Sequence, residues 1–298
     1  MKILITGGTG LIGRALIDKL EDHEITVLTR SAQKAASLLP GRVQYIESLD
    51  ALDSFDDIDA IINLAGEPIV DKRWSEKQKG LICSSRWGIT EQIVKKILES
   101  DSPPHTFISG SAVGYYSDQG DKEIDESLTV DSTDFAHLVC ANWEKIARRA
   151  SATGSTRVCV LRTGVVLSPT GGALKKMLLP YKLGLGGPIG KGQQFFPWIH
   201  IDDMTSGIVH LLNSEDLKGD FNFTAPTPVT NKEFSSALAT ALQRPHFLFT
   251  PEIAIKLALG EASQLLLDSQ KVIPVALQES GFNFSYQTLQ PALENLVQ

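Results

Sequence analysis

Short apolar runs alternate with segments of helical periodicity through the first half of the chain. Apolar, β-branched runs predict buried strands, and apolar residues repeating every three or four positions predict helices that cover a sheet. The predicted strands are KILIT (2–6), EITVLTR (24–30), RVQYIE (42–47), DAIINLAG (59–66), TFISGSA (106–112) and TRVCVLRTGVVL (156–167). The predicted helices are LIGRALIDKLED (11–22), SAQKAASLL (31–39), residues 75–100, DFAHLVCANWEKIA (134–147) and MTSGIVHLLNS (204–214).

This alternation predicts the fold class. Strands that are apolar along their whole length, with helices between them, indicate a parallel sheet covered on both faces. Because crossovers between parallel strands are right-handed, the expected architecture is an α/β Rossmann-type doubly wound sheet. The second half is less regular, and its last sixty or so residues predict a small helical unit with a final strand pair near residues 281–286.

Composition and charge restrict the class of protein. The chain has 298 residues, 42% of them hydrophobic, and a net charge of −7, so a sizeable core is expected and a nucleic-acid partner is not. No apolar run reaches the ~18 residues that a membrane span needs. Three scattered cysteines without metal spacing predict reduced thiols and no metal site. The first strand begins at once, so no signal peptide is predicted and a cytoplasmic location is expected.

The first turn, TGGTGLIGR, carries glycines with the spacing G-x-x-G-x-x-G between a strand and a helix. Glycine there permits a positive φ and lets a pyrophosphate approach the backbone, while the helix N-terminus attracts the anion. The sequence therefore predicts a dinucleotide site. The residues expected to contact the cofactor here are Gly7, Gly10, Leu11, Ile12 and Gly13.

The end of the second strand favours one form of that cofactor. An acid there would accept the ribose hydroxyl of NAD, but the sequence reads VLTRS, with Arg30 in its place and Lys34 beyond. A guanidinium suits a 2′-phosphate, so NADP is predicted over NAD. The expected division is an NAD(P)-binding Rossmann domain over residues 1–235, with 166–192 contributing to the substrate side, and a small C-terminal domain over 236–298.

Longer motifs resemble a known superfamily. TGGTGLIG, NLAG (63–66), ISGSAVGYY (108–116), FPWIHIDDM (196–204) and FNFTAPTPVTNKEF (221–234) are similar to extended short-chain dehydrogenase/reductases of the NAD-dependent epimerase/dehydratase superfamily. INLAGEPIVDKRW, LRTGVVLSPTGGAL, LGLGGPIGKGQQ and the tail resemble its atypical YfcH-type epimerase family proteins. The resemblance covers nearly the whole chain and allows a homodimer. It implies further cofactor contacts from Asn63, Leu64, Ala65 and Gly66.

The superfamily's catalytic pair is missing. Its members use a Tyr and, four residues later on the same helix face, a Lys, together with a Ser on the preceding strand. Here Ser111 matches the Ser, but Phe135 and Val139 stand where Tyr and Lys are expected. The helix is therefore predicted to be a packing wall beside the nicotinamide. Ser111 with Tyr115 is the predicted proton-donating pair in its place.

Other polar residues on and near this helix are weaker candidates for the proton donor. His137 lies about 200° round the helix from Phe135 and cannot share its face. His200 is predicted to be structural, with an Asp of the IDD segment capping the next helix. Glu144 and Lys145 are predicted to form a solvated face, on which Glu144 could pair with Arg148.

The substrate of the nucleotide-sugar members is disfavoured. They hold the diphosphate with an Arg four residues before the His of F-V-H-V-D-D, where this chain has Phe196. The residues predicted to meet another substrate are Lys72, Arg73, Trp74 and Arg86, with Lys191 as a further cation. Two hypotheses remain open: an NADP-binding epimerase or oxidoreductase acting on a small carbonyl or alcohol, and a non-catalytic NADP(H) sensor or scaffold of the same fold.

Overall fold

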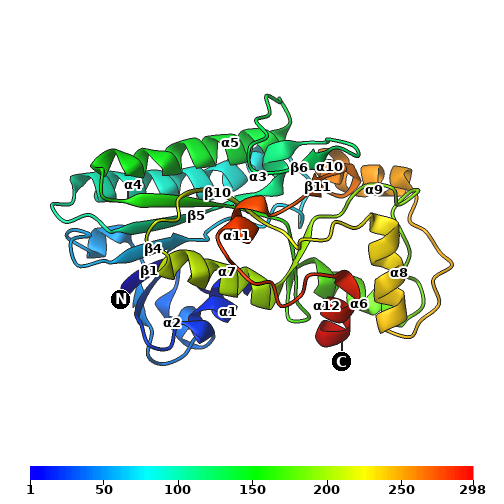
Figure 1. Cartoon of the computed structure of the whole chain (residues 1–298), viewed down its shortest axis with the longest axis horizontal. Helices are drawn as coiled ribbons and strands as arrows, with labels where there is room; N and C mark the ends of the chain where they lie inside the picture. The colour runs from blue at the N-terminus through cyan, green and yellow to red at the C-terminus, as the bar shows by residue number, and fades with distance from the viewer. Residues whose placement is uncertain (298) are drawn as a thin grey trace.

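A seven-stranded, fully parallel sheet forms the centre of the computed structural model, which describes residues 1–297 (Figure 1). Its strand order is β10-β7-β5-β4-β1-β2-β3. The strands are β1 (Lys2–Thr6), β2 (Glu24–Leu28), β3 (Gln44–Ile46), β4 (Ala60–Asn63), β5 (Thr106–Ala112), β7 (Arg157–Thr163) and β10 (Gly219–Phe223). The predicted doubly wound sheet is confirmed. The strand order reverses between β1 and β4, which is where such sheets bind ligands.

Helices cover both faces of the sheet, as the alternating pattern predicts (Figure 1). On one face, Ile5 and Ile108 pack with residues of α1 and α7 such as Leu16 and Ile208. On the other, Phe107 packs with Ile93 of α4. The flanking helices are α1 (Leu11–Lys19), α2 (Ala32–Ala36), α7 (Ile201–Asn213) and α11 (Val275–Glu279) on the first face, and α4 (Ile89–Glu99) and α5 (Phe135–Arg148) on the second.

A second lobe packs around its own core beyond the carboxyl edge of the sheet (Figure 1). Leu174, Trp198, Phe234 and Leu293 are buried together there. The lobe contains β8 (Val165–Leu167), β9 (Trp198–His200), α6 (Gly172–Lys182), α8 (Asn231–Ala241), α9 (Glu252–Leu259), α10 (Gln264–Leu267) and α12 (Leu289–Val297). A short parallel pair, β6 (Glu123–Ile124) with β11 (Lys271–Val272), ties the C-terminal segment back to the chain that follows β5.

Two predicted elements are wrong in detail. The strand expected over residues 156–167 is interrupted at Gly164, because the next N–H, that of Val165, donates to the Pro197 carbonyl, which also leaves no room for a Cβ on Gly164. β7 stays in the main sheet, whereas β8 pairs with β9. The strand pair expected near residues 281–286 does not form, because the N–H groups of Ser285 and Tyr286 donate to the Asp203 carboxylate instead.

Some absences bear on the expected chemistry. Across residues 1–297, no helix is both long and apolar enough to cross a membrane. In the same range, no group of three or more His, Cys, Asp or Glu residues could hold a metal ion. All three cysteines are free thiols.

Candidate active site

The glycine turn after β1 has the geometry of a phosphate cradle. Gly7 has a φ of +69°, and a Cβ there would lie 2.5 Å from the Leu64 carbonyl oxygen. A Cβ on Gly13 would lie 2.4 Å from the Gly7 oxygen, so both positions require glycine. Helix α1 begins after Gly10 without a side-chain cap, which leaves its first N–H groups available to an anion. The turn therefore fits a dinucleotide pyrophosphate.

The loop after β4 is held against this turn by a chain of buried hydrogen bonds. The Thr6 hydroxyl donates to Asn63 Oδ1 over 2.6 Å and accepts from the Ala65 N–H, and Asn63 Nδ2 donates to Thr90 over 2.8 Å. The Asn63 side chain is fully buried, and both its oxygen and its nitrogen are already hydrogen-bonded, so it holds the loop in place. The backbone of Leu64 is then what approaches Gly7.

Arg30 is exposed at the carboxyl end of β2, and no residue from 1 to 297 forms a hydrogen bond or ion pair with its side chain. The neighbouring Ser31 caps α2 by accepting from the Lys34 N–H. In the first turn of α1, Arg14 also has a buried Nε without a partner in the described residues. A free guanidinium at this strand end fits a 2′-phosphate, and the choice of NADP over NAD stays a prediction.

A cavity of about 630 Å³ opens between the carboxyl edge of the sheet and the second lobe. Its walls include Val113 after β5, Thr163 of β7, Cys140 of α5, Met177 of α6 and Asp268 after α10. We call this cavity the cleft. Its size, and its position at the strand ends beyond the glycine turn, are those of a small-molecule site.

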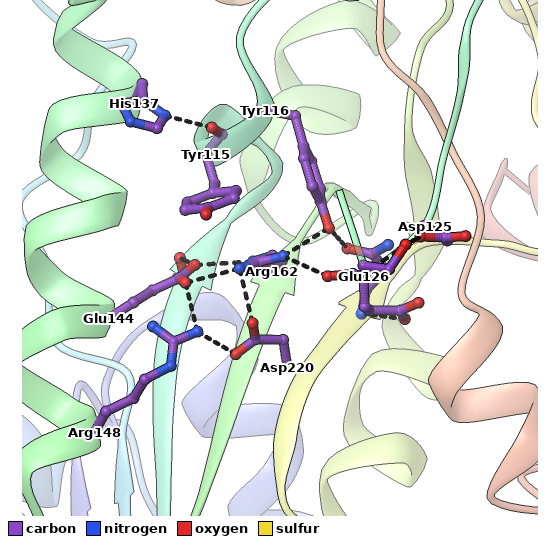
Figure 2. A network of polar contacts seen from close by, with 12 residues as sticks. Tyr115, Tyr116, Asp125, Glu126, His137, Glu144, Arg148, Arg162 and Asp220 are labelled. Carbon is purple, nitrogen blue, oxygen red and sulfur yellow. Dashed lines mark hydrogen bonds and ion pairs between the residues drawn. The ribbon is translucent and has the colours of Figure 1, made fainter. Parts of the chain in front are cut away.

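The predicted proton donors lie behind the cleft, against the core. The Ser111 hydroxyl donates to Glu144 Oε1 over 2.7 Å. The guanidinium of Arg162 lies 3.8 Å from the centre of the Tyr115 ring (Figure 2). Within the described part of the chain, neither Ser111 nor Tyr115 is among the residues lining the cleft. Their catalytic role stays a prediction, and this placement does not favour it.

Glu144 is the centre of an ion-pair network formed with Arg162, which is buried like Glu144, and with the more exposed Arg148 and Asp220 (Figure 2). Each Glu144 carboxylate oxygen accepts from Arg162 over 3.0 Å, and Arg162 also donates to Asp220 over 2.8 Å. We call these four residues the Arg162 network. The prediction that Glu144 lies on a solvated face is wrong, because it is only 1% exposed, whereas its pairing with Arg148 is confirmed.

Both histidines near the site are engaged structurally. His137 Nδ1 lies 2.6 Å from the Tyr115 carbonyl oxygen (Figure 2). His200 is stacked on Tyr286 and accepts the Asp202 N–H at the start of α7. The structural role predicted for His200 is confirmed, but the cap of α7 is His200 itself and not an Asp of the IDD segment.

Helix α5 presents apolar side chains where the superfamily carries its catalytic pair. Phe135 and Val139 pack in one cluster with Trp74 and Ala262, and the rings of Phe135 and Trp74 meet edge to face at 4.8 Å. Val139 is 1% exposed. This face of α5 is thus a packing wall that joins the nucleotide-binding lobe to the C-terminal segment.

The side chains predicted to meet substrate are used elsewhere in the described structure. Those four residues are Lys72, Arg73, Trp74 and Arg86, and none of them lines the cleft, although the preceding residues 68–71 do. Lys72 pairs with Glu67. Arg73 Nε donates to the Ala258 carbonyl at the end of α9, and Trp74 donates to the Ile69 carbonyl. Their role in substrate binding stays a prediction.

Arg86 lies beside the cofactor loop, in a π turn (Ser84–Gly88) that joins α3 (Glu76–Cys83) to α4. It donates to the Glu67 carbonyl over 3.1 Å, and a Cβ on Gly66 would lie 2.9 Å from its Cζ. Burial lowers the pKa of this guanidinium, which remains charged. Arg86 therefore places a cation against Gly66, at the end of the loop that the resemblance assigns to the cofactor.

Asp268 is a cleft residue that sequence reasoning missed. Its carboxylate has no hydrogen-bond or ion-pair partner between residues 1 and 297, and burial, with repulsion from Asp118 and Asp134, raises its pKa to about 6. It follows an ordinary apolar run, LLLD, so no motif marks it. Cys140 also lines the cleft, but burial raises the pKa of its thiol to about 11, so it stays protonated.

Comparison with known proteins matches both parts of the chain. The model of the NAD dependent epimerase/dehydratase family matches residues 3–223, and a domain of unknown function (DUF1731) matches residues 250–296. An epimerase family protein of Staphylococcus saprophyticus is 41% identical over 298 residues, which cover 99% of this chain and 98% of that protein.

Solved structures are similar over the same length. The human epimerase family protein SDR39U1 (isoform 2), crystallised with NADPH, is 37% identical with a TM-score of 0.91, covering 99% of each chain. A nucleoside-diphosphate sugar epimerase of Corynebacterium glutamicum is 30% identical with a TM-score of 0.78, covering all of this chain and 58% of that one. A Bacillus cereus UDP-glucuronic acid 4-epimerase with NAD, 18% identical at a TM-score of 0.78, shares the fold.

Proposed function

The chain belongs to the NAD dependent epimerase/dehydratase family, and on that premise we propose that it binds NADP(H) and exchanges hydride with a small carbonyl or alcohol substrate. The observation that carries this proposal is the cradle of Gly7 and Gly13 at the same edge of the sheet as the cleft. A nucleotide held by the cradle and a substrate held in the cleft would lie on adjoining surfaces.

The unpaired side chain of Arg30 supports the phosphorylated cofactor. An exposed guanidinium loses little solvation when it meets a dianionic phosphate, and its planar donors match the phosphate oxygens. The human relative with NADPH agrees with this choice at 37% identity, whereas the neighbours with NAD share only the fold.

The bound nicotinamide would supply or accept the hydride, so the protein must exchange a proton with the substrate oxygen. We place that exchange at Asp268, rather than at Ser111 and Tyr115, which contact the Arg162 network. With a pKa of about 6, the Asp268 carboxyl is present in both its protonated and ionised forms near neutrality. It can therefore donate a proton in reduction and accept one in oxidation.

Calorimetry with NADPH and NADH tests the cofactor. We expect the unmodified protein to bind NADPH more tightly, and Arg30→Ala to remove the difference without weakening NADH. Lys95→Ala, on the exposed surface of α4, is the control and should keep the preference. Equal affinities of the unmodified protein for the two cofactors would rule out the role of Arg30.

Turnover is tested by following NADPH absorbance with a panel of aldehydes and ketones. We expect Asp268→Asn to lower kcat by about 100-fold or more, the usual contribution of a positioned acid, and Tyr115→Phe to retain activity. Loss of activity in Tyr115→Phe, with activity retained in Asp268→Asn, would assign the role of proton donor to Tyr115. If NADPH binds but no carbonyl is reduced, the sensor or scaffold alternative is favoured.

A further inference from the structure

The cleft offers no free cation in the described structure. Its one basic side chain is Lys176, which is paired with Asp71 on the opposite wall. Asp134 and Asp268 add two further carboxylates. A nucleoside diphosphate needs cations or free N–H donors around its phosphates, and carboxylates would repel it. The charge of the cleft therefore selects against the anionic substrates of the sugar-nucleotide enzymes.

Most polar side chains of the cleft are already satisfied by the protein. Gln270 Nε2 donates to the carbonyls of Val113 and Ser117, both over 3.0 Å. The Tyr181 hydroxyl is bonded to the Ser235 hydroxyl over 2.5 Å, and Gln194 Nε2 donates to the Leu266 carbonyl over 3.2 Å. What remains for a ligand is mostly apolar wall, together with the carboxyl groups of Asp134 and Asp268 and the buried Ser117 hydroxyl, which has no partner in the described residues.

An exposed apolar surface borders the opening of the cleft. It consists of the end of α6 with the residues after it, the segment before α9, and α9 itself, which has no buried residue. Its exposed side chains, which we call the apolar rim, are Leu183 (64% exposed), Leu185 (60%), Phe247 (88%), Phe249 (64%), Ile253 (66%) and Leu257 (68%). Exposed apolar patches of this kind mark sites that meet an apolar ligand or surface.

The apolar rim and the cleft are continuous. Leu185 belongs to both, and Ile255, between two rim residues of α9, lines the cleft. The rim segments are side by side, since a Cβ on Gly187 would collide with the Leu248 carbonyl. Arg73 Nε donates to the Ala258 carbonyl at the C-terminal end of α9, and Lys79 pairs with Glu261 just beyond that end at 2.6 Å.

We propose that the cleft takes an extended, uncharged aliphatic alcohol or aldehyde, which enters across the apolar rim and places its single oxygen near Asp268. The proton exchange at that oxygen rests on the proposed function, whereas the binding of the aliphatic chain does not depend on turnover. Each methylene moved from water onto apolar wall contributes to affinity, so chain length should decide binding. A nucleotide sugar has no aliphatic chain to bury and therefore gains no comparable affinity here.

Titration calorimetry with 1-decanol, 1-butanol and UDP-glucose tests this, with and without saturating NADPH. We expect 1-decanol to bind at least about tenfold more tightly than 1-butanol, because six additional methylenes are buried. UDP-glucose should show no saturable binding. Met177→Glu, which puts a charge on the cleft wall, should abolish 1-decanol binding and leave NADPH affinity unchanged. Leu98→Glu, on the exposed surface of α4, is the matched control.

Three results would overturn the proposal: equal affinities for the two alcohols, no binding of either, or saturable binding of UDP-glucose that persists in Lys232→Ala. Lys191, Lys232 and Lys271 line a separate open depression next to the cleft, so UDP-glucose binding that is lost in Lys232→Ala belongs to that depression and keeps the apolar site. Failure of NADPH to bind, with 1-decanol binding intact, would instead reject the proposed function and keep the apolar site.

Discussion

The Ser111 hydroxyl donates a 2.7 Å hydrogen bond to the buried carboxylate of Glu144, which joins β5 to α5. The strand residue that the superfamily turns towards its substrate is here turned towards a helix. Arg162 completes the arrangement by holding both oxygens of the same carboxylate. Helix α5, which lacks the catalytic Tyr and Lys, is thus fixed to the sheet through the carboxylate of Glu144. The sequence pattern predicts this carboxylate at the surface.

Glu144→Gln should destabilise the protein. The amide keeps the shape of the side chain but leaves Arg148 and Arg162 facing the single carboxylate of Asp220. We expect the free energy of unfolding, measured by urea denaturation at pH 7, to fall by about 2–4 kcal/mol. Lys145→Gln changes the neighbouring exposed residue and should alter it by no more than about 0.5 kcal/mol. Equal effects of the two changes would show that the Arg162 network is energetically neutral.

Gly7→Ala should impair cofactor binding. Alanine at a φ of +69° is strained by about 1–2 kcal/mol, and its Cβ would press on the Leu64 carbonyl. Relief of that strain must open the cradle, so the Kd for NADPH should rise by about tenfold or more. Gly41→Ala is the control, because a Cβ there meets nothing within 4 Å. Unchanged NADPH affinity in Gly7→Ala would mean that the cofactor does not use this turn.

Asp268→Asn should stabilise the protein at neutral pH. The folded-state pKa is raised from 3.8 to about 6, so between these values the folded protein holds a proton that the unfolded chain releases. The unmodified protein therefore loses stability as pH rises through this window, and the variant does not. After discounting for the solvent around this half-buried group, we expect a gain of about 1 kcal/mol at pH 7.5.

That gain should vanish below about pH 4, where Asp268 is protonated in both states. Thermal unfolding across pH 4–8 measures it, with Asp131→Asn on the exposed surface as the control. A gain that does not change with pH would show that the effect comes from packing and not from the charge of Asp268.

Val139→Lys should not reinstate the superfamily's pair. Val139 is 1% exposed and packs with Ile82 and Trp74, so an ammonium there would be buried without a partner. We expect the free energy of unfolding to fall by about 3 kcal/mol or more. Phe135→Tyr changes a half-buried ring of the same wall and should cost less than about 1 kcal/mol. A stable Val139→Lys protein would show that the wall can open to solvent.

The sequence by itself determined the elements whose signals are local. The run KILIT, the glycine spacing from Gly7 to Gly13 and the helical periodicity of residues 134–147 each depend on neighbouring residues, and all predict elements that the structure contains. The absence of Tyr and Lys from α5 is equally local. A motif of contiguous residues is enough to predict a turn, a strand or a missing side chain.

Only the tertiary structure decided which polar groups are buried together. Glu144 meets Arg162 on β7 and Ser111 on β5, Gly164 is restricted by Pro197, and Asp268 reaches the cleft from the far end of the chain. No periodicity along the chain encodes these contacts, because their energy depends on the solvent and charge that distant segments remove or supply. The fold and the glycine turn were therefore readable from the sequence, whereas the proposed proton-exchanging group and the polarity of the cleft required the packed molecule.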